Sequence, residues 1–144
     1  MNHIDLINKT VFVTGSAGFI GSNLVLELLR TQSPIHIIGL DNMNNYYDVN
    51  IKKWRLKEIE KCVAEHNDST YVFYKDDLAN KAIIDKIFAE HKPDIVVNLG
   101  AQAGVPVTFA DTSALEKDYR FKPDTSLRTG LRHFAEWYKE FYNV

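Results

Sequence analysis

Apolar residues in the first hundred positions fall into short runs that alternate with longer amphipathic segments. The short runs are rich in β-branched residues, which is typical of buried strands; they cover 10–15, 35–41, 70–78 and 94–101. The segments between them carry apolar residues at helical spacing; they cover 19–32, 49–67 and 81–91. Strands that alternate with helices predict a parallel sheet with right-handed crossovers. This part of the chain is therefore expected to have an α/β fold.

The apolar positions of the first two helices predict which face of each is buried. The face of the first helix is formed by Ile20, Leu24, Val25, Leu28 and Leu29. The second helix has a rougher stripe, formed by Ile51, Trp54, Leu56, Ile59 and Val63. Both stripes follow the 3.6-residue period and should face the sheet.

The pattern changes after Pro106. Residues 106–111 predict a short strand or an extended segment, and residues 114–119 a short helix. A longer helix is predicted over 127–142, and its apolar face is strongly aromatic, with Leu127, Leu131, Phe134, Ala135, Tyr138, Phe141 and Tyr142. We expect such a face to be buried against another surface.

Composition excludes several classes of function. The 144 residues are 45% hydrophobic and 25% charged, as in an ordinary globular domain. A net charge of -2 gives no electrostatic case for binding nucleic acid or an anionic membrane. No apolar run is long enough to span a membrane, and no signal peptide is evident. The single cysteine, Cys62, cannot form an internal disulfide, so we expect a cytoplasmic protein.

Three glycines stand between the first predicted strand and the helix that follows it. Gly15, Gly18 and Gly21 lie three residues apart in "TGSAGFIG". The first glycine permits a sharp turn, the second lets the backbone approach a pyrophosphate, and the third lets the helix pack closely on the sheet. The helix N-terminus offers free N–H groups to phosphate. The spacing predicts a dinucleotide site, and the alternative is a glycine-rich turn without a ligand.

Two acids follow the next predicted strands. Asp41 ends the second strand, 20 residues after Gly21, where a carboxylate accepts hydrogen bonds from ribose hydroxyls. An acid there favours NAD over NADP, because it repels a 2′-phosphate. Asp77 follows the third strand and is a candidate for the adenine amino group. The alternatives are a loop-capping role for Asp41 and, for Asp77, a solvated position beside Asp76.

Several segments together resemble the extended short-chain dehydrogenase/reductases, the epimerases and dehydratases of nucleotide sugars. They are "TGSAGFIGSNL", "DNMNNYYDVNIKKWRL", "YKDDL" and "VVNLGAQAGV". The second segment and "AQAGV" look most like the UDP-glucuronate 4-epimerases. The resemblance implies a truncated Rossmann-type fold of three layers, strand order 3-2-1-4, and NAD as cofactor. The cofactor-binding residues it implies are Gly15, Ala17, Gly18, Phe19, Ile20, Gly21, Asp41, Asn42, Asn44, Asp77, Leu78, Leu99 and Ala101.

The resemblance covers residues 8–105 and resumes at 106, where "PVTFADTS" is similar to the C-terminal end of the same family. The two patterns meet at Val105–Pro106. This implies a half-Rossmann NAD-binding domain over 1–105, joined to a C-terminal segment over 106–144 with a short strand and two helices. The missing middle would carry the catalytic Ser/Thr, the Tyr-x-x-x-Lys pair and most of the sugar-nucleotide pocket.

The chain does contain one tyrosine with a lysine four residues later, Tyr71 and Lys75. They fall in an alternating strand pattern, in which four residues span about 13 Å rather than one helical turn. We therefore expect no catalytic residue from this pair, or elsewhere in the chain. The five histidines show no metal-ligand spacing, so no metal site is expected.

Three functions remain open on the sequence. The first is a catalytically incomplete relative that binds NAD or an adenine nucleotide. The second is an active UDP-sugar epimerase completed by oligomerisation, and the third is an interaction domain in which the aromatic helix docks a partner. An exposed apolar fourth strand at the sheet edge would favour association. We expect a homodimer, with C-terminal segments exchanged as one possible arrangement.

Overall fold

The structure is a computed structural model, and it describes residues 5–66, 68–101, 116–117 and 125–143. The chain divides into two compact units, Met1–Gly104 and Val105–Val144. Each unit is described by itself.

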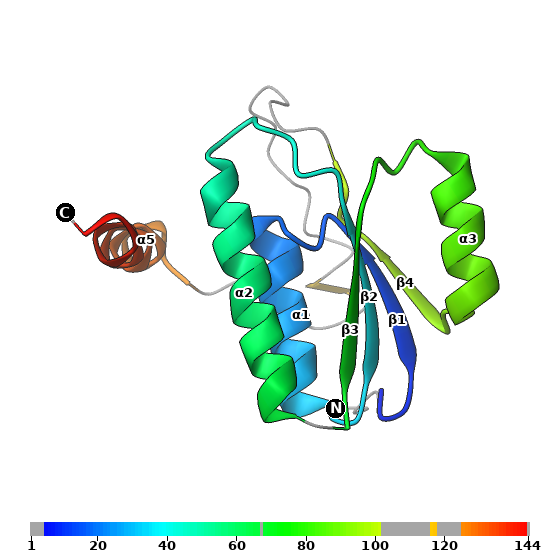
Figure 1. Cartoon of the computed structure of the whole chain (residues 1–144). Helices are drawn as coiled ribbons and strands as arrows, with labels where there is room; N and C mark the ends of the chain where they lie inside the picture. The colour runs from blue at the N-terminus through cyan, green and yellow to red at the C-terminus, as the bar shows by residue number, and fades with distance from the viewer. Residues whose placement is uncertain (1–4, 67, 102–115, 118–124, 144) are drawn as a thin grey trace. The chain divides into compact units, whose positions relative to one another are not determined.

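The first unit is an α/β sheet domain, as the alternating pattern predicts. In chain order it contains β1 (Thr10–Thr14), α1 (Phe19–Thr31), β2 (His36–Asp41), α2 (Val49–Glu65), β3 (Thr70–Lys75), α3 (Lys81–His91) and β4 (Ile95–Asn98). All strand pairs are parallel, and the order is β3-β2-β1-β4. Helices α1 and α2 cover one face of the sheet and α3 covers the other, which gives three layers (Figure 1). The predicted fold class and strand order are confirmed.

The core has two parts because successive strand residues point to opposite faces. On one face, Val11, Val13 and Ile37 pack with residues of α1 and α2. On the other face, Phe12, Ile38 and Leu40 pack against Ile87 of α3. Ile87 is fully buried and is the one buried residue of α3. The sheet is therefore held by two helices on one side and by a single helix on the other.

The predicted apolar stripe of α2 holds at Ile59, which is fully buried, and at Val63, which packs against the core, but fails at Trp54. The buried residues of this helix are Lys52, Arg55, Ile59 and Cys62, and Trp54 is 38% exposed. The buried set still follows helical spacing, but two long cations occupy its first half. Apolar periodicity could not predict that Lys52 and Arg55 are buried, because their burial depends on polar partners from other elements.

The predicted stripe of α1 fails at one position. Val25 and Leu29 are fully buried, as expected, whereas Ile20 is 65% exposed. Ile20 stands in the first turn of the helix, where it lines a cavity instead of the core. A stripe read from sequence cannot separate a residue that faces the core from one that faces a ligand cavity.

The described part of the second unit contains α5 (Leu127–Tyr142). The Ser126 hydroxyl caps this helix by accepting a hydrogen bond from the backbone N–H of Thr129, at 3.1 Å. Leu131, Phe134 and Tyr138 of its apolar face are exposed. The strand predicted over 106–111, and most of the helix predicted over 114–119, lie outside the described residues. Within the described ranges, no helix combines the length and apolar character needed to cross a membrane.

Candidate functional site

The glycine-rich loop joins β1 to α1 and turns sharply at Gly15. This residue has φ +67, and a Cβ built on it would lie 2.9 Å from the carbonyl carbon of Leu99. Its backbone N–H donates to the Leu40 carbonyl at 2.7 Å. The loop is thus wedged between the ends of β2 and β4, and only glycine combines this φ with the available space.

The third glycine sets how closely α1 approaches the loop. A Cβ on Gly21 would collide with the carbonyl oxygen of Gly15 and would lie 2.9 Å from the Cα of Ser16. Gly18, at the N-cap, supplies no side-chain hydrogen bond to the first turn of α1. The uncapped N–H groups carry the partial positive charge of the helix end, which suits a phosphate.

A cavity of about 720 Å³ opens where the carboxyl ends of the strands meet. This is the edge at which open parallel sheets bind ligands. Of the cofactor residues implied by the sequence, all line the cavity except Ala17, which is fully buried under the loop. Seven further residues complete the lining: Thr14, Leu40, Tyr46, Tyr47, Lys52, Asp76 and Gly100.

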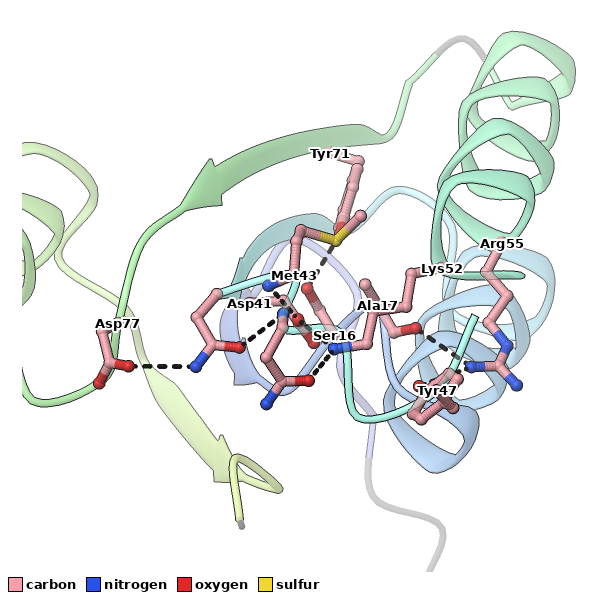
Figure 2. Close-up of polar contacts among 11 residues, drawn as sticks. Ser16, Ala17, Asp41, Met43, Tyr47, Lys52, Arg55, Tyr71 and Asp77 are labelled. Carbon is pink, nitrogen blue, oxygen red and sulfur yellow. Dashed lines mark hydrogen bonds and ion pairs between the residues drawn. The ribbon is translucent and has the colours of Figure 1, made fainter. Parts of the chain in front are cut away.

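Asp41, the last residue of β2, has a buried carboxylate with a charged partner. Its Oδ1 accepts from the backbone N–H of Met43 at 2.8 Å and from Nζ of Lys52 at 3.1 Å. The same Lys52 ammonium donates to Oδ1 of Asn44 at 2.9 Å. Both side chains of the ion pair are close to fully buried, at 5% and 6% exposed. A single oxygen of Asp41, Oδ1, therefore both caps the loop after β2 and forms the ion pair with Lys52 (Figure 2).

Arg55 connects α2 to the glycine-rich loop. Its Nη1 donates to the carbonyl oxygen of Ala17 at 3.3 Å and to the hydroxyl of Tyr47 at 3.1 Å. The guanidinium lies over the rings of Phe19 and Tyr47, with 5.7 and 5.8 Å to the ring centroids. One buried cation thus joins the loop, the start of α1 and the segment after β2; Figure 2 shows its bonds to Ala17 and Tyr47.

Asp77 lies in the turn after β3 and has a partner on each oxygen. Oδ1 accepts from the backbone N–H of Ala79 at 2.9 Å, and Oδ2 accepts from the Asn42 amide at 3.1 Å. These two bonds hold the pKa of Asp77 below its ordinary value, and the bond from Ala79 has the larger effect. The carboxylate is therefore ionised at neutral pH and organises the cavity wall next to Leu78.

The end of β4 is fixed to β1 through Thr14. Its hydroxyl accepts from the backbone N–H groups of Leu99 at 3.1 Å and Gly100 at 2.9 Å, and it donates to the Asn98 amide oxygen at 2.6 Å. These bonds keep residues 99–101 in the lining of the cavity, next to Gly15 of the glycine-rich loop.

Tyr71 and Lys75 lie on β3, as the alternating pattern predicts. The Tyr71 hydroxyl donates to Oγ of Ser16 at 3.2 Å. Burial, as the largest cause, raises the pKa of Tyr71 to about 12. Such a phenol is protonated at neutral pH, so it is unsuited to act as a base, and it braces the loop instead.

Sequence reasoning missed Lys52 and Arg55. The usable signal was their i, i+3 spacing in register with Ile59 and Cys62, which places four residues on one face of α2. Charged residues are seldom buried without partners, so apolar periodicity assigned them to solvent. Their partners, Asp41 and the Ala17 carbonyl, come from other elements and are visible only in the fold.

Comparison with known proteins agrees with the geometry. Residues 12–118 match the family model described as GDP-mannose 4,6 dehydratase. The chain is 38% identical over 109 residues to "Protein CapI" of Staphylococcus aureus, covering 72% of this chain and 30% of that protein. It is 33% identical over 129 residues to a UDP-glucuronate 4-epimerase of Thermodesulfobacterium geofontis, covering 90% of this chain and 35% of that one. The chain therefore spans about a third of the length of these relatives.

Solved structures show the same fold. The dTDP-glucose 4,6-dehydratase of Bacillus anthracis, determined in complex with NAD, matches with a TM-score of 0.53 and 27% identity, over 66% of this chain and 27% of that chain. A UDP-glucose 4-epimerase of Stenotrophomonas maltophila, with bound NAD and a formylated UDP-arabinopyranose, matches with a TM-score of 0.52 and 26% identity, over 68% and 26%. The family model matches most of this chain. The chain therefore belongs to the GDP-mannose 4,6 dehydratase family, within the Rossmann-type epimerases and dehydratases of nucleotide sugars.

Proposed function

We propose that this chain binds NAD and holds its adenosine diphosphate portion in the cavity at the carboxyl ends of the strands. One observation carries the proposal: the glycine-rich loop, the uncapped start of α1 and the Asp41 carboxylate all meet at that cavity. A Cβ on Gly21 would collide with the loop backbone, so the loop conformation depends on glycine. The dehydratase and epimerase structures with the same fold hold NAD.

Each part of the cavity suits one part of the dinucleotide. The N–H groups at the start of α1, beside Phe19 and Ile20, would hold the pyrophosphate. The remaining oxygen of Asp41 would accept from the adenosine ribose. Asp77 and Leu78 would adjoin the adenine, and Leu99 and Ala101 the nicotinamide side.

We also propose that the site is catalytically incomplete. The family resemblance places the catalytic Ser/Thr and Tyr-x-x-x-Lys in a segment that this sequence lacks between Val105 and Pro106. The one tyrosine at the required spacing, Tyr71, hydrogen-bonds Ser16 and has a raised pKa. Both observations support binding without turnover.

We also propose that the chain forms a homodimer in the cytoplasm. Among the described residues, β4 is an edge strand, and Val96 on it is 48% exposed. An unpaired strand edge with an exposed apolar side chain favours pairing with another chain. The single cysteine fits a reducing compartment.

Calorimetric titration with NAD, ADP-ribose and UDP-glucuronate tests the proposed function. We expect NAD and ADP-ribose to bind, and UDP-glucuronate neither to bind nor to turn over with NAD present. Gly21→Ala should abolish binding because the added Cβ meets the Gly15 carbonyl. Gly130→Ala is the matched control, since among the described residues a Cβ at that position meets nothing within 4 Å beyond its own helix backbone and chain neighbours; it should leave binding unchanged.

Three results would contradict the proposal in different ways. Absence of NAD binding at millimolar concentration would mean that the glycine-rich loop is inherited architecture and would favour an interaction domain. Epimerisation of UDP-glucuronate would show that a second copy completes the site. Equal losses in Gly21→Ala and Gly130→Ala would mean that binding does not use the loop.

A further inference from the structure

The ribose end of the cavity is built around a buried ion pair rather than around a lone acid. Asp41 and Lys52 are 3.1 Å apart, and both are nearly excluded from solvent. The ammonium is held in place by Oδ1 of Asn44 at 2.9 Å and lies 5.3 Å from the centre of the Tyr47 ring. Lys52 also lines the cavity, beside Asp41, the residue proposed to accept from the adenosine ribose.

This arrangement changes the electrostatic reason for preferring NAD. A lone carboxylate would repel the 2′-phosphate of NADP, but here its charge is balanced by the adjacent ammonium. Two of the three ammonium protons have acceptors in the described part of the chain, Asp41 and Asn44. Opposite charges that are this close and this well buried interact strongly. Asp41 therefore holds the Lys52 ammonium, which could otherwise bind a phosphate.

We propose that Lys52 is a latent 2′-phosphate ligand and that its pairing with Asp41 sets the discrimination between NAD and NADP. This inference rests on the proposed function, because it assigns a role within the same adenosine site. Asp41 disfavours NADP by engaging the Lys52 ammonium, since that cation already balances the charge of the carboxylate. Once the acid is neutralised, the ammonium can form charge-assisted hydrogen bonds with the phosphate oxygens.

The experiment measures the ratio of the dissociation constants for NADP and NAD in four chains: wild type, Asp41→Asn, Lys52→Met and the double variant. Asp41→Asn keeps an oxygen that can accept from the Met43 N–H, so the loop should be retained. We expect Asp41→Asn to lower the NADP/NAD ratio by about tenfold or more, the size of one charge-assisted hydrogen bond. The double variant should lose most of that gain, since the phosphate then has no ammonium to bind.

Lys53→Met is the matched control. It removes the same charge from the next residue of α2, whose side chain is exposed, and should leave the ratio unchanged with or without Asp41→Asn. Adenosine 2′,5′-bisphosphate and AMP, titrated against the same variants, repeat the test with ligands that use only the adenosine end. Circular dichroism confirms that each variant is folded.

The outcomes separate this inference from the proposed function. If wild type binds neither NAD nor AMP, the proposed function fails and the inference fails with it. If wild type binds NAD but Asp41→Asn lowers the ratio equally with and without Lys52, repulsion alone sets the preference, and Lys52 is not a phosphate ligand. A third outcome is that Lys52→Met weakens the binding of NAD and of NADP by the same factor. If the double variant also keeps the lower NADP/NAD ratio of Asp41→Asn, the role of Lys52 is structural.

Discussion

Arg55 contacts the glycine-rich loop from outside the lining of the cavity. Its guanidinium bonds the Ala17 carbonyl inside the glycine-rich loop and stacks on Phe19 at the start of α1. Arg55→Met would keep most of the side-chain volume but leave the carbonyl and the Tyr47 hydroxyl without this donor. We predict that NAD and ADP-ribose bind about tenfold or more weakly to this variant, the effect of one lost hydrogen bond to a charged group. Isothermal titration calorimetry measures the change.

The control for Arg55→Met separates an effect on the glycine-rich loop from an effect on binding of the adenosine part of the ligand. Adenosine has no pyrophosphate, so its affinity should fall much less in Arg55→Met than that of ADP-ribose. Tyr47→Phe removes one partner of Arg55 but keeps the ring and the Ala17 bond, so it should cost less than Arg55→Met. An equal loss of adenosine and ADP-ribose affinity would show that Arg55 supports the whole domain and not the loop in particular.

The buried phenol of Tyr71 makes a pH-dependent contribution to stability. Its pKa is raised to about 12 in the folded chain, chiefly by burial, against about 10 in an unfolded one. The folded state thus favours the protonated phenol. This contribution is complete below about pH 10 and is lost as the pH rises toward 12. We predict that wild type loses more stability than Tyr71→Phe between pH 9 and about 11, measured by urea denaturation.

A titration by absorbance near 295 nm gives an independent check. It should contain a tyrosine that ionises at a raised pKa and that is absent in Tyr71→Phe. Identical pH profiles of stability for the two chains would mean that Tyr71 ionises in the folded state as it does in the unfolded one. The same variant also tests the brace on the loop, since it removes the hydrogen bond to Ser16.

At the scale of single elements, α3 is the sole helix described on its face of the sheet within the first unit. Ile87 is its one buried residue and meets Phe12, Ile38 and Leu40. We predict that Ile87→Ala lowers the free energy of unfolding by about 2–5 kcal/mol, the usual cost of emptying a buried aliphatic site. Urea denaturation followed by circular dichroism measures it.

Asp85→Ala on the same helix serves as the reference. Asp85 is paired only with the exposed Lys81, and both side chains lie in solvent. Removing such a pair changes stability by less than about 1 kcal/mol. Comparable losses for Asp85→Ala and Ile87→Ala would mean that α3 contributes through its helicity and not through packing on the sheet.

The sequence predicted elements better than it predicted their faces. Every strand and helix of the first unit lies within its predicted range, because β-branched runs and helical periods are local signals. On α2, the burial of Lys52 and Arg55 escaped prediction because their acceptors lie on β2 and in the glycine-rich loop. For the site, the glycine spacing and the acid after β2 located the cavity. The cations that tune it depend on contacts between segments far apart in the chain.

At the scale of the whole molecule, β3 and β4 are the two edge strands of the sheet in the described part of the first unit. Val72 and Val96 lie in the same row across the sheet, in register with Ile38 and Phe12. Both valines are exposed, at 39% and 48%. The two edges therefore present chemically matched positions, and the proposed homodimer would use β4, the strand beside which the family resemblance places the missing segment.

Val96→Lys tests that assignment, with Val72→Lys as its counterpart on the other edge. A lysine on an edge strand opposes pairing with a second chain. We predict that sedimentation velocity shows a dimer for wild type and Val72→Lys, and a monomer for Val96→Lys. NAD binding should persist in all three chains, because neither valine lines the cavity. A dimer that survives in Val96→Lys but is lost in Val72→Lys would move the interface to β3. Survival in both variants would leave the sheet edges unused and would place the contact elsewhere on the molecule.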